Sequence, residues 1–197
     1  MRHSLSELLA VVYRFYPRGL RQYDPGYKAT EEYRRLVQAR IHAGADGNPW
    51  DVFLDRLSVR FPDEPKGTIQ NGSVHLPTGR MDAGYIGCFW LPPRGPWEKN
   101  HMIGFLVSFL VPCYVVYSSA HISVSAKDPE AWSHQIHFTF SPDEAPCAQV
   151  ITEEIVSAFP DYELMPPEIG NVVVTDVEPN SPMGKATLYH CLFTDAW

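Results

Sequence analysis

Residues 104–119 read GFLVSFLVPCYVVYSS and hold the longest apolar run of the sequence. That run, Phe105–Tyr117, is interrupted by Ser108 and Pro112, and it is well short of the about 20 residues that a membrane-spanning helix needs. Its β-branched and aromatic residues favour strands, and a proline between them marks a break. The stretch therefore predicts buried strands.

Further strands are expected on both sides of this run. They are short, rich in aromatic or β-branched residues, and separated by Pro, Gly and Asn turns. The predicted strands are Thr68–Leu76, Gly84–Leu91, Met102–Leu110, Tyr114–Val124 and Gln135–Phe140, with Val172–Val177 and Ala186–Phe193 as a closing hairpin. Apolar residues alternate with polar ones in Gln135–Phe140, so one face of that strand is expected to be solvated.

Helices are predicted before and after these strands. Thr30–Gly44 is typical of a helix capped by its first residue, and Pro49 begins a second helix that ends before Pro62. A later helix begins near Pro146, where apolar residues recur at helical spacing. Leu8–Tyr16 has apolar residues at helical spacing but a strand-like composition, and we expect a strand there.

This order of elements predicts an α+β fold in a single domain over residues 1–197. We expect a mostly antiparallel sheet of about six to eight strands, with N-terminal helices and one later helix packed on one face. The chain is long enough for one well-buried core. With 45% hydrophobic and 20% charged residues, it is typical of a globular protein and not of a disordered one.

The cysteines and the N-terminus indicate a cytoplasmic protein. Polar residues interrupt the N-terminal apolar segment, which is untypical of a signal peptide. The four cysteines lie far apart in the sequence and form no CxxC pair: Cys88, Cys113, Cys147 and Cys191. This spacing predicts free thiols in a reducing compartment, with no zinc ribbon and no disulfide framework.

The charge is unevenly distributed along the chain. The net charge is −7, yet residues 1–60 carry ten Lys and Arg against seven Asp and Glu, whereas the remainder carries six against sixteen. An acidic balance argues against nucleic acid as the main partner and is compatible with a basic protein partner.

Complete catalytic or metal-binding motifs are missing from the sequence. It has no GxxxxGK[ST], GxGxxG, HExxH, GxSxG or EF-hand pattern. His134 and His137 are three apart on a predicted strand, which places their rings on opposite faces. His121 would share a polar strand face with Ser123 and Ser125, and a nucleophile pair with Cys113 would still lack a third group and oxyanion donors. No catalytic residue, metal or cofactor is expected.

What remains is a set of acidic residues in the C-terminal half, together with one loop tryptophan. Prolines in PPRGPWEKN would hold Trp97 outward at low entropic cost, as in a rigid binding anchor. The alternative is that Trp97 folds back and covers the sheet. In the later helix, Glu153 and Glu154 are expected to face solvent. The candidate partner-binding residues are Trp97, Asp143, Glu144, Glu153, Glu154, Asp161, Glu163, Asp176 and Glu178.

Several segments together give the chain a likeness to a known group of proteins. The segments are TEEYRRLV, PWDVFLDRL, GFLVSFLVPCYVVYSS, IHFTFSPDEAP and the Val-rich C-terminal region. In these, the chain resembles the small cytosolic immunity proteins encoded beside bacterial polymorphic toxins. The resemblance implies a protein without catalytic activity that binds a toxin and covers its active site, with an acidic surface where the toxin is a nuclease with a basic groove.

Three functional hypotheses follow. The first is an immunity or inhibitor protein that occludes a toxin through an acidic surface, with neither nucleic acid nor membrane as partner. The alternative is a small-molecule-binding domain or an enzyme whose pocket includes His121 and His137. The third is a chaperone or adaptor for a secreted effector, which would bind away from the effector's active site. The oligomeric state is left open.

Overall fold

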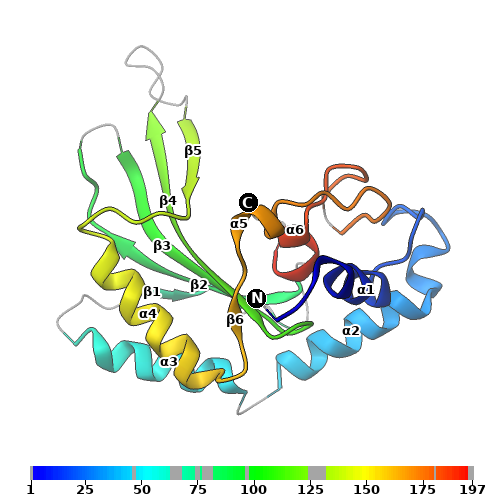
Figure 1. Cartoon of the computed structure of the whole chain (residues 1–197), viewed down its shortest axis with the longest axis horizontal. Helices are drawn as coiled ribbons and strands as arrows, with labels where there is room; N and C mark the ends of the chain where they lie inside the picture. The colour runs from blue at the N-terminus through cyan, green and yellow to red at the C-terminus, as the bar shows by residue number, and fades with distance from the viewer. Residues whose placement is uncertain are drawn as a thin grey trace.

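The computed structural model describes residues 2–45, 48–62, 68–73, 76, 82–95, 98–123, 132–179 and 181–194 (Figure 1). Its helices are α1 (Leu5–Phe15), the 3₁₀ helix η1 (Tyr27–Ala29), α2 (Glu31–Ala43), α3 (Pro49–Arg60), α4 (Ala145–Ala158), α5 (Pro167–Gly170) and α6 (Leu188–Leu192). Its strands are β1 (Ile69–Asn71), β2 (Gly84–Leu91), β3 (Glu98–Ser108), β4 (Cys113–Ser123), β5 (Trp132–His137) and β6 (Glu163–Leu164). The α+β class and the N-terminal helices are confirmed.

The strands form a single sheet across the described residues. Its order is β1-β2-β3-β4-β5, and β6 lies beside the first residues of β4. Consecutive strands from β1 to β5 pair antiparallel, whereas β6 runs parallel to β4. The predicted mostly antiparallel sheet is therefore confirmed, although β1 ends at Asn71 and not at Leu76.

The long strands β3 and β4 divide the apolar residues between two cores. Phe105 lies opposite Val116 in the register and Leu106 lies opposite Val115. The first pair belongs to one buried cluster and the second pair to another, because successive residues of a strand point to opposite faces. The near-continuous apolar run at residues 104–119 is explained by burial of both faces of the sheet.

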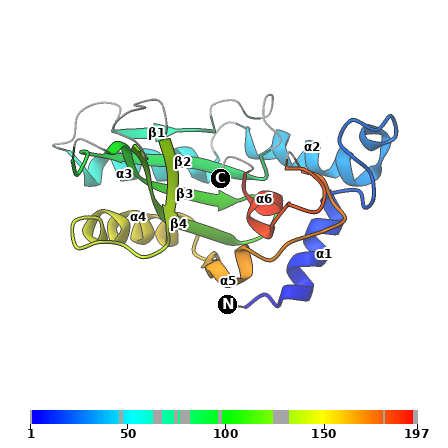
Figure 2. The same ribbon diagram turned by 90° about the horizontal axis from the view of Figure 1, so that it is seen from above.

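Helices cover both of these faces (Figures 1 and 2). Trp50 and Phe53 of α3 join Ile151 of α4 in the cluster around Phe105. The cluster on the other face contains buried residues of α1 and α6, among them Leu8. The sequence predicted helices on one face of the sheet only, and the helices on the second face correct that prediction. In the described ranges, every helix falls short of the length and apolar character that crossing a lipid bilayer requires.

Two glycines in the sheet make room for aromatic rings on the neighbouring strand. A Cβ atom on Gly87 would lie 2.1 Å from the ring of Phe105, and one on Gly104 would lie 2.2 Å from the ring of Tyr117. Each glycine is directly opposite its aromatic partner in the register. The two rings lie in different clusters, so each face of the sheet contains one such contact.

The first helix corrects the strand predicted at Leu8–Tyr16. Ser4 caps α1: its Oγ accepts from the Glu7 backbone N–H at 3.3 Å, and its own N–H donates to the Glu7 carboxylate at 2.7 Å. Leu8 and Val12 are buried one turn apart in the helix. The capping box and this apolar stripe outweigh the strand-like composition of the segment.

The C-terminal region also differs from its predicted hairpin. Pairing between Val172–Val177 and Ala186–Phe193 is reduced to one bridge, between Val173 and Thr187. Thr187 then caps the short helix α6 in place of the second strand. Leu188 and Leu192 are one turn apart there, and both are buried against the sheet and α1. The apolar spacing fits a helix at least as well as a strand, and tertiary burial selects the helix.

The predicted helices after α1 are confirmed. Thr30 caps α2 by accepting from the Tyr33 backbone N–H, and Gly44 forms the C-cap. Asn48 caps α3, whose first residue is Pro49. The Thr30 and Asn48 side chains accept hydrogen bonds from backbone N–H groups that have no partner within the helix.

Candidate functional site

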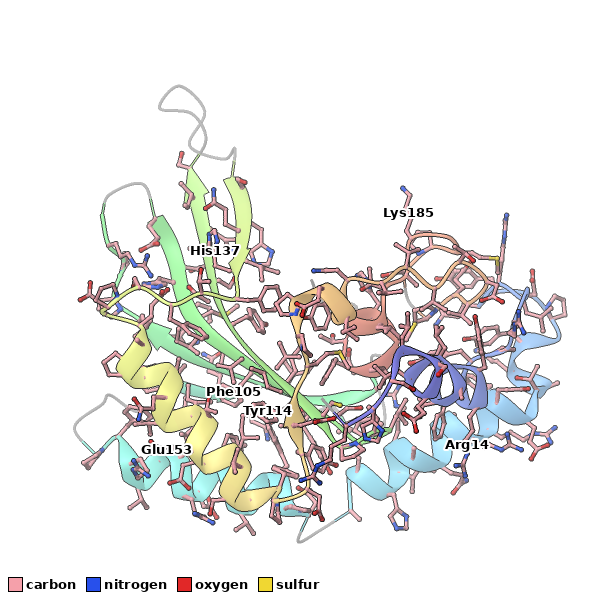
Figure 3. All side chains as sticks on the ribbon, viewed as in Figure 1. Arg14, Phe105, Tyr114, His137, Glu153 and Lys185 are labelled. Carbon is pink, nitrogen blue, oxygen red and sulfur yellow. The ribbon has the colours of Figure 1, made fainter. Side chains whose placement is uncertain are left out.

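The predicted acidic surface is dispersed over the molecule. Asp143 and Asp161 are exposed at the two ends of α4. Glu163 lies on β6, where it accepts hydrogen bonds from the backbone of Arg2 at 2.6 and 2.7 Å. Figure 3 shows Glu153 on the α4 side of the sheet, across the molecule from Arg14 of α1. Trp97 lies outside the described residues, as does Ser125.

Two further acids, Asp176 and Glu178, lie near the first helices. The Asp176 carboxylate accepts from Arg18 Nε at 2.6 Å and from the Tyr13 hydroxyl at 3.1 Å. Its pKa is lowered, because these hydrogen bonds and the Arg18 charge outweigh the opposing effect of burial. The backbone oxygen of Glu178 accepts from the Tyr27 hydroxyl at 3.0 Å. These hydrogen bonds connect the loop that contains Asp176 and Glu178 to α1, to η1 and to the loop between them.

Glu144 lies at the centre of a buried polar network and has 2% of its surface exposed. Its Oε1 accepts from Ser118 Oγ and from Arg94 Nη2, and it lies 2.9 Å from His101 Nε2. Its Oε2 accepts from the Ser141 backbone N–H at 2.7 Å. Burial alone would raise its pKa, but the hydrogen bonds from Ser118, His101 and Ser141 lower it to about 2.

This network differs from a nucleophilic triad in the order of its groups. In a Ser-His-acid triad the imidazole lies between hydroxyl and carboxylate, so that it takes the hydroxyl proton. Here the carboxylate of Glu144 lies between Ser118 and His101. A carboxylate with a pKa of about 2 is a poor base at neutral pH. The network instead joins β3, β4 and the start of α4.

Glu154 is also buried, which corrects the expectation that it faces solvent. It has 6% of its surface exposed, and its carboxylate lies 2.7 Å from Arg60 Nη1 and 2.9 Å from Arg56 Nη2. Glu153 is exposed, as predicted, and lies 3.2 Å from Arg60 Nη2. These ion pairs join α4 to α3. Like Glu144, Glu154 has little surface to offer a partner.

The histidine and cysteine hypotheses can be compared with the sheet register. His134 lies opposite His121 and His137 lies opposite Ser118, which places His134 and His137 on opposite faces, as predicted. Cys113 and His121 are at opposite ends of β4, about 26 Å apart at the rise of a strand. Burial raises the Cys113 pKa to about 12. Cys113 and His121 therefore form no nucleophile pair.

An open groove follows the outer side of α4 and has a volume of about 610 Å³. Its lining residues on α4 recur at helical spacing: Ala145, Ala148, Gln149, Thr152, Glu153 and Val156, joined by Phe140. Two alanines leave space along the helix, and Val156 is 44% exposed beside it. The groove therefore combines an apolar lining with one of the predicted contact acids, Glu153.

A second hollow, of about 600 Å³, lies where α2 ends and α3 begins. It is lined by Gln38, Ala39, His42, Ala43, Ala45, Asn48, Pro49, Tyr85 and Phe109. Neither His121 nor His137, which the alternative hypothesis places in a pocket, lines it. Across the residues that the structure places, no group of three or more His, Cys, Asp or Glu is arranged to hold a metal ion.

Tyr23 is an exposed aromatic residue that the sequence reasoning missed. It is 90% exposed in the loop between α1 and η1. The loop is hydrogen-bonded around it, because the Arg21 N–H donates to Asp24 Oδ2 at 2.7 Å and the Asp24 N–H donates to the Arg21 carbonyl at 2.9 Å. The Asp-Pro-Gly turn signal directly after Tyr23 indicates such a rigid loop.

The comparisons with known proteins return no relative of this chain. No protein-family model, no curated protein and no solved structure matches it.

Proposed function

We propose that this protein is a non-catalytic, cytoplasmic inhibitor that binds a partner protein and neutralises it, as an immunity protein neutralises its toxin. The observation that carries the proposal is the groove along α4, where Glu153 and Val156 lie on one open, largely apolar surface. The proposed occupant is a basic, amphipathic segment of the partner. Aliphatic contact in the groove would supply affinity, and acidic side chains would steer the encounter.

The charges around the groove support a basic occupant. Helix α4 contains no Lys or Arg over its 14 residues. Exposed Asp143 and Asp161 lie at its two ends and Glu153 lies at the groove itself. The arginines of α3 offset part of this charge, because Arg56 and Arg60 pair with the buried Glu154, and Arg60 also lies 3.2 Å from Glu153 at the groove. Asp143 and Asp161 add negative charge at the two ends of α4.

The buried polar network supports the absence of catalysis. Glu144 is buried among polar side chains, and its hydrogen bonds keep it ionised. With a pKa of about 2, the Glu144 carboxylate is a poor acid or base near neutral pH. A binding surface that is already ordered before the partner arrives has a lower entropic cost of association.

The experiment is affinity purification of the tagged protein from its native cells through a high-salt wash. We expect one stoichiometric partner whose activity is toxic when it is expressed alone, and whose activity is lost in the complex. Recovery of the protein without a partner at physiological salt would contradict the proposal. A partner that stays bound but fully active would instead establish the chaperone or adaptor hypothesis.

A matched pair of substitutions locates the interface. Val156→Arg places a bulky charge in the groove, whereas Val59→Arg makes the same change on α3, at a valine that is 76% exposed and outside the groove. We expect partner binding to be lost in the first variant and retained in the second. Loss of binding in Tyr23→Ala together with retention in Val156→Arg would move the interface to the α1–η1 loop.

A further inference from the structure

Two histidines face each other across β4 and β5 on the sheet face opposite Glu144. His121 and His134 are directly opposite in the register, and their ring centroids are 4.8 Å apart at an interplanar angle of 64°. His134 is exposed and His121 is half-buried. Asn100 of β3 lies opposite His121 on its other side, so that three polar residues form a row across three strands.

One nitrogen of each ring is already held by a neighbouring polar group. His121 Nδ1 lies 3.0 Å from the Asn100 side-chain amide, and His134 Nε2 lies 2.7 Å from Ser119 Oγ. These contacts leave His121 Nε2 and His134 Nδ1 as the ring nitrogens to coordinate a ligand. In a metal-binding histidine, the second ring nitrogen donates its N–H in a hydrogen bond that orients the ring. At His121 this requires the Asn100 amide to turn so that its oxygen, and not its NH₂ group, faces Nδ1.

The spacing of the rings also fits a shared metal ion. With a metal–nitrogen distance of about 2.0–2.1 Å, a metal lies about 3.2 Å from each ring centroid, so two ligands about 90–110° apart have centroids about 4.5–5.2 Å apart. The observed separation of 4.8 Å falls inside this range. The centroid separation is therefore compatible with a shared ion.

We propose that His121 and His134 bind a divalent transition-metal ion of the Zn²⁺, Ni²⁺ or Cu²⁺ class. Imidazole nitrogen is a preferred ligand of these ions, in contrast to Mg²⁺ and Ca²⁺, which prefer oxygen. Within the described ranges, no third His, Cys, Asp or Glu completes the site. Water fills the remaining coordination positions, so binding is weaker than in a site with three or four protein ligands and the ion stays open to exchange.

Proton competition gives the site a pH dependence. Coordination uses an unprotonated ring nitrogen, so protons compete with the metal ion for both imidazoles. Metal binding is therefore expected to weaken as the pH falls and the imidazoles become protonated.

The test is a titration of the full-length protein with Zn²⁺ alone, followed by calorimetry and by competition with a chromophoric chelator. We expect one bound ion per chain. Loss of a hydrogen bond to a metal-binding histidine weakens metal binding by about 10- to 100-fold. Because His121→Ala and His134→Ala each remove a ligand itself, we expect a larger loss of affinity in both variants. His137→Ala is the matched control, because it removes an exposed histidine of the same strand on the opposite face.

The outcomes separate clearly. Binding that is unchanged in His121→Ala or His134→Ala, equally weakened in His137→Ala, or undetectable at millimolar Zn²⁺ would overturn the proposal. A Cu²⁺ electron paramagnetic resonance spectrum gives a second readout, in which two nitrogen ligands are expected for the wild-type chain and one for each single variant. Because no partner protein is present, these results do not depend on the proposed inhibitory function.

Discussion

The two halves of β4 belong to one continuous strand but are stabilised in different ways. In the apolar half of β4 (Cys113–Tyr117), both faces are buried in the two hydrophobic clusters. In the polar half of β4 (Ser118–Ser123), Ser118 bonds to Glu144, Ser119 to His134, and His121 to Asn100. Figure 1 shows this second half extending beyond α1 and α6. Apolar burial thus holds the centre of the sheet, and specific polar pairs hold the end that carries the candidate metal site.

The largest expected effect is in the apolar half. Phe105 lies opposite Val116, is fully buried and contacts the rings of Trp50 and Phe53. Phe105→Ala should lower the free energy of unfolding by about 3–5 kcal/mol through lost burial and a residual cavity. Urea denaturation measures the change, with Val59→Ala as an exposed control. A smaller loss of unfolding free energy than in the polar-half variants would contradict the greater contribution of the apolar half to stability.

The second prediction concerns the polar half and the pH dependence of the stability that Glu144 provides. The Glu144 pKa is lowered from 4.5 to about 2 in the folded protein, so its contribution to stability is present above about pH 5 and is lost as the pH falls toward 2. At 1.36 kcal/mol per pKa unit, this contribution is at most about 3 kcal/mol. Glu144→Gln should therefore be less stable than the wild type at pH 7, and the two unfolding free energies should converge near pH 2. If the unfolding free energies of the two proteins run parallel from pH 7 to pH 2, the hydrogen bonds do not lower the Glu144 pKa.

A third variant probes the boundary between the two halves. Gly104 lies beneath the ring of Tyr117, the last residue of the apolar half. Gly104→Ala should cost about 1–3 kcal/mol, because the added methyl group overlaps the ring and the strands must shift. Thermal unfolding measures the change. Restored stability in the double variant Gly104→Ala, Tyr117→Leu would confirm the steric cause, whereas an unchanged deficit would refute it.

The smallest effect is expected at Ser119. Ser119→Ala removes a hydroxyl that bonds His134 Nε2, and the net value of such a hydrogen bond is about 1 kcal/mol. Chemical denaturation should detect a change of this size or less. A destabilisation as large as that of Phe105→Ala would mean that the polar half supports the fold as strongly as the core does.

The central strands could be predicted from the sequence because burial of both faces leaves a clear signature. The apolar and β-branched residues at 104–119 are enough to identify buried strands, without knowledge of the strands that pair with them. The segment Leu8–Tyr16 was misjudged, because composition favours a strand while a capping box at Ser4 and Glu7 favours a helix. At Ala186–Phe193, the helix depends on which apolar residues meet the sheet and α1, and this is decided by tertiary packing.

The candidate sites depend on contacts between residues far apart in the chain. The acidity of residues 143–178 is evident from the sequence, but the pairing of Glu154 with Arg56 and Arg60 requires α3 to lie against α4. The His121 and His134 pair depends on the register of β4 and β5. A shift of one residue in that register would place the two rings on opposite faces. Sequence spacing alone does not determine it.

We propose that this protein neutralises a partner by binding it through the α4 groove. The most direct measurement is a titration of the partner's activity, recovered by co-purification, with the wild-type protein and with Val156→Arg. We expect activity to fall to zero near one equivalent of wild-type protein and to persist at the same concentration of the variant. A partner that remains fully active in saturating wild-type protein, or that is inhibited equally by the variant, would contradict the claim.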